Sequence, residues 1–179
     1  MITYVAFLRG VNVSGRHKIQ MAGLKELLSK QKLEDVKTYI QSGNVVFRSE
    51  LENSKELENL IAKAILNHFN FDVPVIVMTI SKLKELLDRN PFKTDDEHLQ
   101  KQNYFVLLKE VPSAEAVEKL SKETFKTEDF LVANDCIFLK CTAGYGKAKL
   151  NNNLIERKLK VEATTRNYRT MSKLLELSV

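Results

Sequence analysis

Three polar segments of the sequence group cations with glycine, asparagine or threonine, a combination that favours binding of an anion. Arginine and lysine pair with phosphate or carboxylate oxygens, and glycine lets backbone N–H groups approach a ligand closely. The sequence therefore predicts anion-binding residues at Arg9, Asn12, Arg16, Lys18, Gly144, Gly146, Lys147, Lys149, Arg166, Asn167 and Arg169.

The first segment, residues 8–18, lies between an apolar run and an amphipathic run. The polar stretch of about twelve residues is longer than most connections in compact domains, and such loops often carry function. A solvated loop with incidental charge remains the alternative.

The second segment, residues 142–149, is not a Walker A loop, because Cys141 and Ala148 replace a required glycine and a required Ser or Thr. Lys149 also replaces the third glycine of a dinucleotide fingerprint. Backbone N–H groups and two lysines ahead of a helix could still cradle an anion. A plain strand-to-helix turn explains the glycines equally well.

The third segment, residues 163–170, precedes the last amphipathic run. Asn167 as the N-cap of a helix would put Arg169 in the first turn, where the helix dipole disfavours a cation. A bound anion would neutralise Arg169, and so would an internal salt bridge. Both interpretations stay open.

No other chemistry is indicated. His17, His68 and His98 are scattered, so we expect no metal site, no cofactor and no assignable catalytic residue. Cys136 and Cys141 lack the spacing of a zinc or redox site, and we expect ordinary buried thiols.

Charge is unevenly distributed along the 179 residues. The formal net charge is +5; residues 1–49 and 140–173 are basic, whereas residues 50–139 are acidic. In one interpretation, the two basic segments meet at one anion site. In the other, they are Lys-rich helices that keep the protein soluble. The longest apolar run is too short for a membrane helix, and there is no secretory leader, so we expect a cytoplasmic protein without membrane contact.

These segments sit on a pattern of elements that occurs twice. Each half reads strand–helix–strand–strand–helix–strand, with hairpin signals at 42–44 and 134–135. The pattern predicts an α+β fold of two tandem ferredoxin-like (βαββαβ) subdomains with antiparallel sheets. We expect the first subdomain at 1–80, a connecting helix and linker at 81–102, and the second subdomain with a C-terminal helix at 103–179.

Three motifs carry a family resemblance: residues 8–16 (LRGVNVSGR), 38–47 (TYIQSGNVVF) and 164–170 (TTRNYRT). With these motifs the chain resembles the bacterial family called domain of unknown function 1697. The resemblance implies two ferredoxin-like subdomains in tandem. It implies no activity.

The leading functional hypothesis is a protein that binds a phosphate-bearing or otherwise anionic ligand, either a nucleotide-like metabolite or a nucleic-acid backbone. Two other classes stay open: an enzyme acting on a phosphorylated substrate, with Lys147 or His17 as proton carrier, and an interaction protein that uses an open sheet face. A homo-oligomer stays open but is not indicated.

Overall fold

The computed structural model describes residues 1–13, 15 and 17–179. The chain forms two compact units: unit 1 comprises Met1–Lys84 and Lys173–Val179, and unit 2 comprises Glu85–Ser172. Each unit has an antiparallel four-stranded sheet with helices in βαββαβ order. The predicted fold class is therefore confirmed. Among the described residues, no helix has the length and apolar character needed to cross a membrane.

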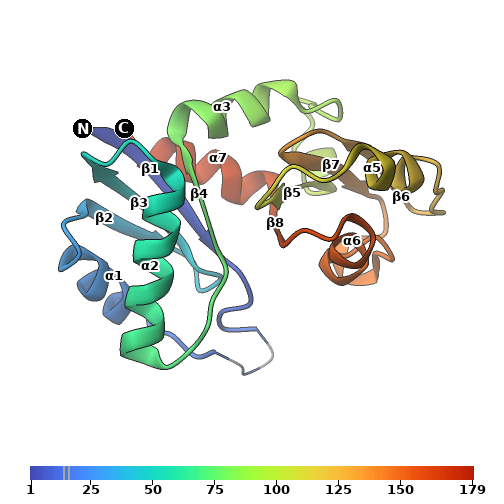
Figure 1. Ribbon diagram of the computed structural model, residues 1–179. Helices are drawn as coiled ribbons and strands as arrows, with labels where there is room; N and C mark the ends of the chain where they lie inside the picture. Colours follow the sequence, from blue (N-terminus) through green and yellow to red (C-terminus); the bar gives the residue numbers. More distant parts are fainter. Residues whose placement is uncertain (14, 16) are drawn as a thin grey trace. The chain divides into compact units, whose positions relative to one another are not determined.

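Unit 1 holds its sheet in the strand order β2-β3-β1-β4. Figure 1 shows both helices of the βαββαβ motif on the same face of this sheet. Its elements are β1 (Ile2–Leu8), α1 (Met21–Ser29), β2 (Glu34–Tyr39), β3 (Asn44–Ser49), α2 (Ser54–Phe69) and β4 (Val75–Thr79).

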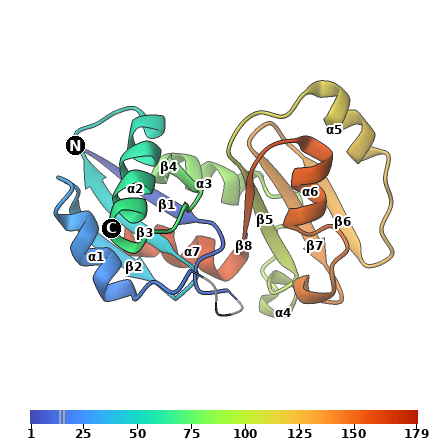
Figure 2. The same ribbon diagram turned by 60° about the horizontal axis from the view of Figure 1, so that its bottom comes forward.

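Unit 2 repeats this order as β6-β7-β5-β8. Its two longer internal helices also share one face of the sheet (Figure 2). Its elements are α4 (Glu97–Gln100), β5 (Asn103–Leu108), α5 (Ala114–Ser121), β6 (Glu128–Val132), β7 (Cys136–Cys141), the 3₁₀ turn η1 (Tyr145–Lys147), α6 (Asn152–Leu159) and β8 (Ala163–Asn167).

Two further helices, α3 (Ile80–Arg89) and α7 (Tyr168–Leu177), contain the boundaries between the units. Within unit 2, the Arg89 guanidinium lies over the ring of Phe138, and the Tyr168 ring packs against Phe105. Within unit 1, Lys37 Nζ donates to the carbonyl of Leu177 at 2.9 Å. The residues of α3 and α7 are thus packed into the units to which they belong.

Successive residues of a strand point to opposite faces of the sheet, and in the central strands the residues on both faces are apolar. In β1, Tyr4, Ala6 and Leu8 join the core beneath α1 and α2. The intervening Val5 and Phe7 point to the other face and are also fully buried. A strand buried on both faces reads as a continuous apolar run, which is how this segment appears in the sequence.

In each unit, a glutamate of the second helix accepts one backbone N–H of the edge strand, β4 or β8. Glu58 of α2 is buried, and its Oε1 accepts the backbone N–H of Val77 at 3.1 Å. In unit 2, Oε1 of Glu156 on α6 accepts the N–H of Ala163 at 2.9 Å. An edge strand leaves backbone groups without a strand partner, and the carboxylate supplies one.

We predict that Glu58→Ala lowers the free energy of unfolding by about 1–3 kcal/mol, because the buried N–H of Val77 loses its acceptor. Urea denaturation measures the change. Asn59→Ala, an exposed position on the same helix, is the control and should change stability by less than about 0.5 kcal/mol. Equal stability of the Glu58 variant and wild type would contradict this role.

Candidate functional site

The first predicted segment forms the connection between β1 and α1, which we call the unit 1 loop (residues 9–20). The loop is anchored where β1 ends. The N–H of Leu8 donates to the carbonyl of Gly43 at 2.8 Å, and the N–H of Arg9 donates to the carbonyl of Pro74 at 2.9 Å. Three separate segments of unit 1 therefore meet here: the loop, the β2–β3 turn and the segment that enters β4.

Asn12, predicted to contact a ligand, holds the loop together. Its Oδ1 accepts the N–H of Ile19 at 2.9 Å. Its Nδ2 donates to the carbonyls of Ile19 at 2.9 Å and Gln41 at 2.8 Å. Both amide protons are thus engaged within unit 1. Asn12 thus joins two points of the loop, residues 12 and 19, to each other and to the β2–β3 turn.

The β2–β3 turn (residues 40–43) packs tightly against this loop. Gly43 has φ +77°, and a Cβ there would lie 2.6 Å from Val11 Cγ2 and 2.7 Å from Leu8 Cβ. The next residue, Asn44, is fully buried, and its Nδ2 donates to the carbonyl of Tyr39 and to Ser42 Oγ, both at 3.0 Å. Only glycine allows this approach. The hairpin predicted at 42–44 is present, with Asn44 as the first residue of β3.

The predicted cations of the unit 1 loop differ in exposure. Arg9 is partly buried and Lys18 is exposed. Arg16, also predicted to contact a ligand, lies outside the described residues, as does Ser14. His17, which sequence reasoning did not place in the binding set, stacks against Phe71 with 5.0 Å between ring centroids. Its Nδ1 is buried and has no hydrogen-bond partner among the described residues.

One end of the second predicted segment contacts a buried carboxylate of the same unit. Glu128 is 6% exposed, and its Oε1 accepts the N–H of Lys149 and the hydroxyl of Thr127, both at 3.1 Å. The N–H groups of Thr142, Gly144, Lys147 and Ala148 donate to backbone carbonyls of the same region. Few amides remain for a ligand, and the side chains of Lys147 and Lys149 are exposed. Gly146 is exposed, and Gly144 has φ +83°.

The third segment forms β8 and the start of α7. Asn167 Oδ1 accepts the N–H of Thr170 at 2.8 Å, so Asn167 caps α7 as predicted. Arg169 lies in the first turn and is exposed. Arg166 is 7% exposed, and its Nη1 donates to Thr164 Oγ1 at 2.8 Å and to the carbonyl of Thr165 at 2.9 Å. Burial lowers the pKa of Arg166 to about 10, so the guanidinium remains charged at pH 7.

The second and third segments touch each other in unit 2, but their cations do not converge. Tyr145 OH donates to Thr165 Oγ1 at 3.1 Å, and that hydroxyl donates to Asn152 Oδ1 at 2.6 Å. Successive residues of a strand point to opposite faces of the sheet. Arg166 therefore points away from the face that carries Tyr145 and the 142–149 loop.

The two cysteines are free and buried, as expected from the sequence. Burial raises the pKa of the Cys141 thiol to about 12, with a smaller contribution from the negative charge of Glu128. Glu128 and Cys141 are directly paired in the β6–β7 register. Because the thiolate is the nucleophile, Cys141 does not have the environment of a reactive cysteine, and Cys136 is buried away from solvent.

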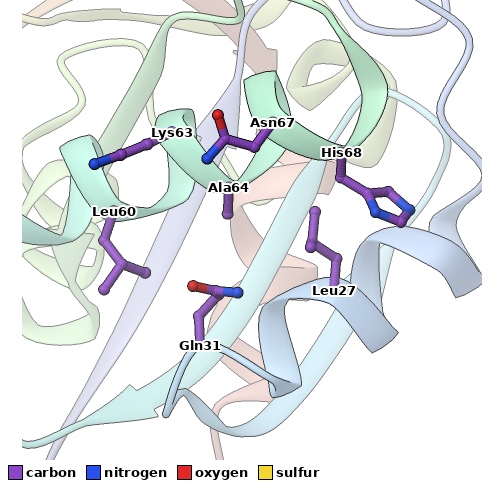
Figure 3. A pocket seen from close by; sticks show the side chains of 7 residues that line it. All are labelled: Leu27, Gln31, Leu60, Lys63, Ala64, Asn67 and His68. Atoms are coloured by element: carbon purple, nitrogen blue, oxygen red, sulfur yellow. The ribbon is translucent and has the colours of Figure 1, made fainter.

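An open groove of about 550 Å³ lies between α1 and α2 of unit 1. Figure 3 shows Leu27, Leu60 and Ala64 directed into the space between the helices. Gln31, Lys63, Asn67 and His68 complete the lining. None of these residues belongs to the predicted anion-binding set, and Lys63 is the one lysine or arginine in the lining as described.

A comparison with family models gives one match, described as "Protein of unknown function (DUF1697)", over residues 1–138. The chain belongs to this family. The match includes the unit 1 loop and the β2–β3 turn, and it ends before the 142–149 loop.

Among solved structures, the chain is similar to the conserved bacterial protein SP0830 from Streptococcus pneumoniae, with a TM-score of 0.77 and 22% sequence identity. The similarity covers 99% of each chain. At this identity it shows the fold alone. A search of curated proteins gives no match.

Three residues of the unit 1 site were not among the predicted binding residues: Ile40, Gln41 and Gly43. Gly43 was identified as part of a hairpin, but its contact with Leu8 and Val11 joins segments far apart in the sequence. Ile40 has φ +49°, which no sequence pattern indicates for a β-branched residue.

We predict that Gly43→Ala lowers the free energy of unfolding by about 2–4 kcal/mol, because the new Cβ overlaps Leu8 and Val11 and the residue is held at positive φ. Chemical denaturation measures the change. Gly146→Ala is the matched control: its Cβ would meet no atom within 4 Å, so we expect a change within about 0.5 kcal/mol. Similar stability changes in both variants would contradict the close-packing account.

We also predict that a thiol reagent at pH 8 leaves Cys136 and Cys141 unmodified in the folded protein and modifies both in guanidinium chloride. Burial excludes the reagent, and the high pKa of Cys141 keeps its thiol protonated. Mass spectrometry after timed labelling measures the modification. Rapid labelling of either residue under native conditions would contradict this expectation.

Proposed function

We propose that this protein binds a phosphate-bearing ligand at the unit 1 loop. The observation that carries the proposal is the difference between the two units at equivalent positions. In unit 2, the N–H groups of Leu108 and Lys109 donate to the carbonyls of Asp135 and Glu162, as those of Leu8 and Arg9 do to Gly43 and Pro74.

From these equivalent anchors, unit 2 reaches α5 in five residues, 109–113, whereas unit 1 takes twelve residues, 9–20, to reach α1. The fold itself therefore needs only the short connection. Additional loop length of this kind supports a role outside folding.

The charge of the loop supports an anionic ligand. Residues 1–25 contain Arg9, Arg16, Lys18 and Lys25 but no Asp or Glu. Arginine provides a planar fork of donors that matches phosphate oxygens, and lysine adds a positive charge. By contrast, the 142–149 loop of unit 2 directs its N–H groups to internal carbonyls and to Glu128. The unit 1 loop is the better candidate.

We predict that Arg9→Ala weakens binding of pyrophosphate and of nucleoside phosphates by about tenfold or more, because it removes a charge-assisted hydrogen bond. Isothermal titration calorimetry in 50 mM salt measures the affinity. Lys109→Ala is the matched control, since Lys109 occupies the equivalent position of unit 2 and forms an ion pair with Glu162 at 2.8 Å. It should leave affinity unchanged.

A short single-stranded RNA in the same assay separates the two sources of phosphate. For a nucleic-acid backbone, the logarithm of affinity falls steeply with the logarithm of salt concentration. For a small ligand held by one or two cations, the dependence is weak. If no phosphate compound binds, or if Lys109→Ala is as damaging as Arg9→Ala, the proposed function is wrong.

A further inference from the structure

Two large apolar side chains are exposed in the unit 1 loop and in the β2–β3 turn that it contacts. Val13 is 55% exposed and Ile40 is 48% exposed. Val13 follows Asn12, Ile40 precedes Gln41, and the Asn12 side chain donates to the Gln41 carbonyl at 2.8 Å. The two apolar residues are therefore neighbours of a hydrogen-bonded pair. Single exposed apolar residues are common on protein surfaces, so their exposure by itself decides nothing.

The backbone of Ile40 gives the second observation. Its φ is +49°, in the left-handed region, where a β-branched residue is a genuine outlier. Residues in this region are usually glycine or asparagine, which adopt it at lower cost. The turn that contains Ile40 is held by the hydrogen bond from the Asn44 side chain to the Tyr39 carbonyl and by the contact of Gly43 with Leu8.

An isoleucine here gives unit 1 neither a relaxed backbone nor a fully buried side chain. Strained residues of this kind persist where the surrounding structure over-determines them, and they cluster at ligand sites. Arg9 lies in the same part of the unit, because the N–H of the preceding Leu8 donates to the carbonyl of Gly43 in the turn. An apolar contact and a cationic contact side by side suit a ligand that has both characters.

We propose that Val13 and Ile40 contact the organic part of the phosphate-bearing ligand, which makes the ligand a nucleoside phosphate rather than an inorganic anion. This inference rests on the proposed function. The phosphate binds the cations of the loop, and the base or sugar covers the exposed apolar surface of Val13 and Ile40. Covering about half of an aliphatic side chain gives a gain in affinity of about fivefold to tenfold.

The experiment compares pyrophosphate with ADP, GDP, CDP and UDP, which carry the same diphosphate with an added nucleoside. We expect at least one nucleoside diphosphate to bind about tenfold more tightly than pyrophosphate. Ile40→Asn and Val13→Ser should each remove most of this advantage and leave pyrophosphate affinity unchanged. Leu131→Ser, at an equally exposed leucine of β6 (52%), is the control and should change neither affinity.

Thermal unfolding shows whether Ile40 is a strained residue kept for ligand contact or a residue that stabilises the fold. Asparagine suits the left-handed region, so Ile40→Asn should raise the melting temperature by about 2–4 °C. A structural isoleucine would instead lose stability on this substitution. Val13→Ser provides a second variant that does not alter the strained position.

The outcomes distinguish the two proposals. If neither pyrophosphate nor any nucleoside diphosphate binds, the proposed function fails, and this inference fails with it. If pyrophosphate binds as tightly as every nucleoside diphosphate, the loop binds phosphate but this inference is wrong. It is also wrong if Ile40→Asn and Val13→Ser weaken pyrophosphate as much as they weaken the nucleoside diphosphate, or if Ile40→Asn lowers the melting temperature.

Discussion

The contact of Gly43 with Leu8 and Val11 is the constraint on which the unit 1 site depends. The turn approaches β1 so closely that no Cβ fits between them, and the Leu8 N–H donates to the Gly43 carbonyl at this point. The approach brings Gln41 within reach of the Asn12 side chain. It also leaves Ile40 in the left-handed region. The close approach at Gly43, the hydrogen bond of Asn12 to Gln41 and the strained backbone of Ile40 thus lie within one short turn.

Unit 2 has the same architecture as unit 1 but lacks the long connection that follows the first strand. Its β5 is anchored by the same pair of backbone hydrogen bonds, and its β8 edge is closed by a helix glutamate as in unit 1. The connection that follows β5 is short. At the start of β6, Glu128 is buried and accepts the N–H of Lys149 from the 142–149 loop. The shared fold accounts for the anchors and the edge glutamates, and the differences between the units lie in their loops.

Much of the fold could be predicted from the sequence because its signals are local. The apolar run Tyr4–Leu8, the hairpin residues around Gly43 and the capping residue Asn167 each report on their own segment. Residues 92–102, expected to form a linker, contain the short helix α4. Its cap, Asp96, accepts the N–H groups of His98 and Leu99. Four residues are too few to show a helical period, which explains why the pattern did not reveal it.

The site was harder to predict because its geometry depends on contacts between distant segments. Asparagine is a residue type that often contacts ligands, but the side-chain amide of Asn12 donates hydrogen bonds to the carbonyls of Ile19 and Gln41. Gln41 lies 29 residues away in the sequence. The glycines and lysines of 142–149 suggest an anion cradle, but the N–H of Lys149 donates to Glu128 of the same unit, and four other N–H groups of the loop donate to backbone carbonyls. Residue type indicates which groups can bind an anion. It does not indicate whether the protein already supplies one.

This distinction has an energetic consequence for the two candidate loops. Glu128 is buried and its Oε2 has no partner among the described residues, so turning the Lys149 N–H toward a ligand would remove one of the hydrogen bonds that compensate this buried carboxylate. The N–H of Lys149 therefore contributes to the stability of unit 2. In the unit 1 loop, the Asn12 side chain makes three hydrogen bonds, and Lys18 and Val13 are exposed. If the loop binds a ligand as we propose, the bonds of Asn12 need not be broken first, and such preorganisation lowers the cost of binding.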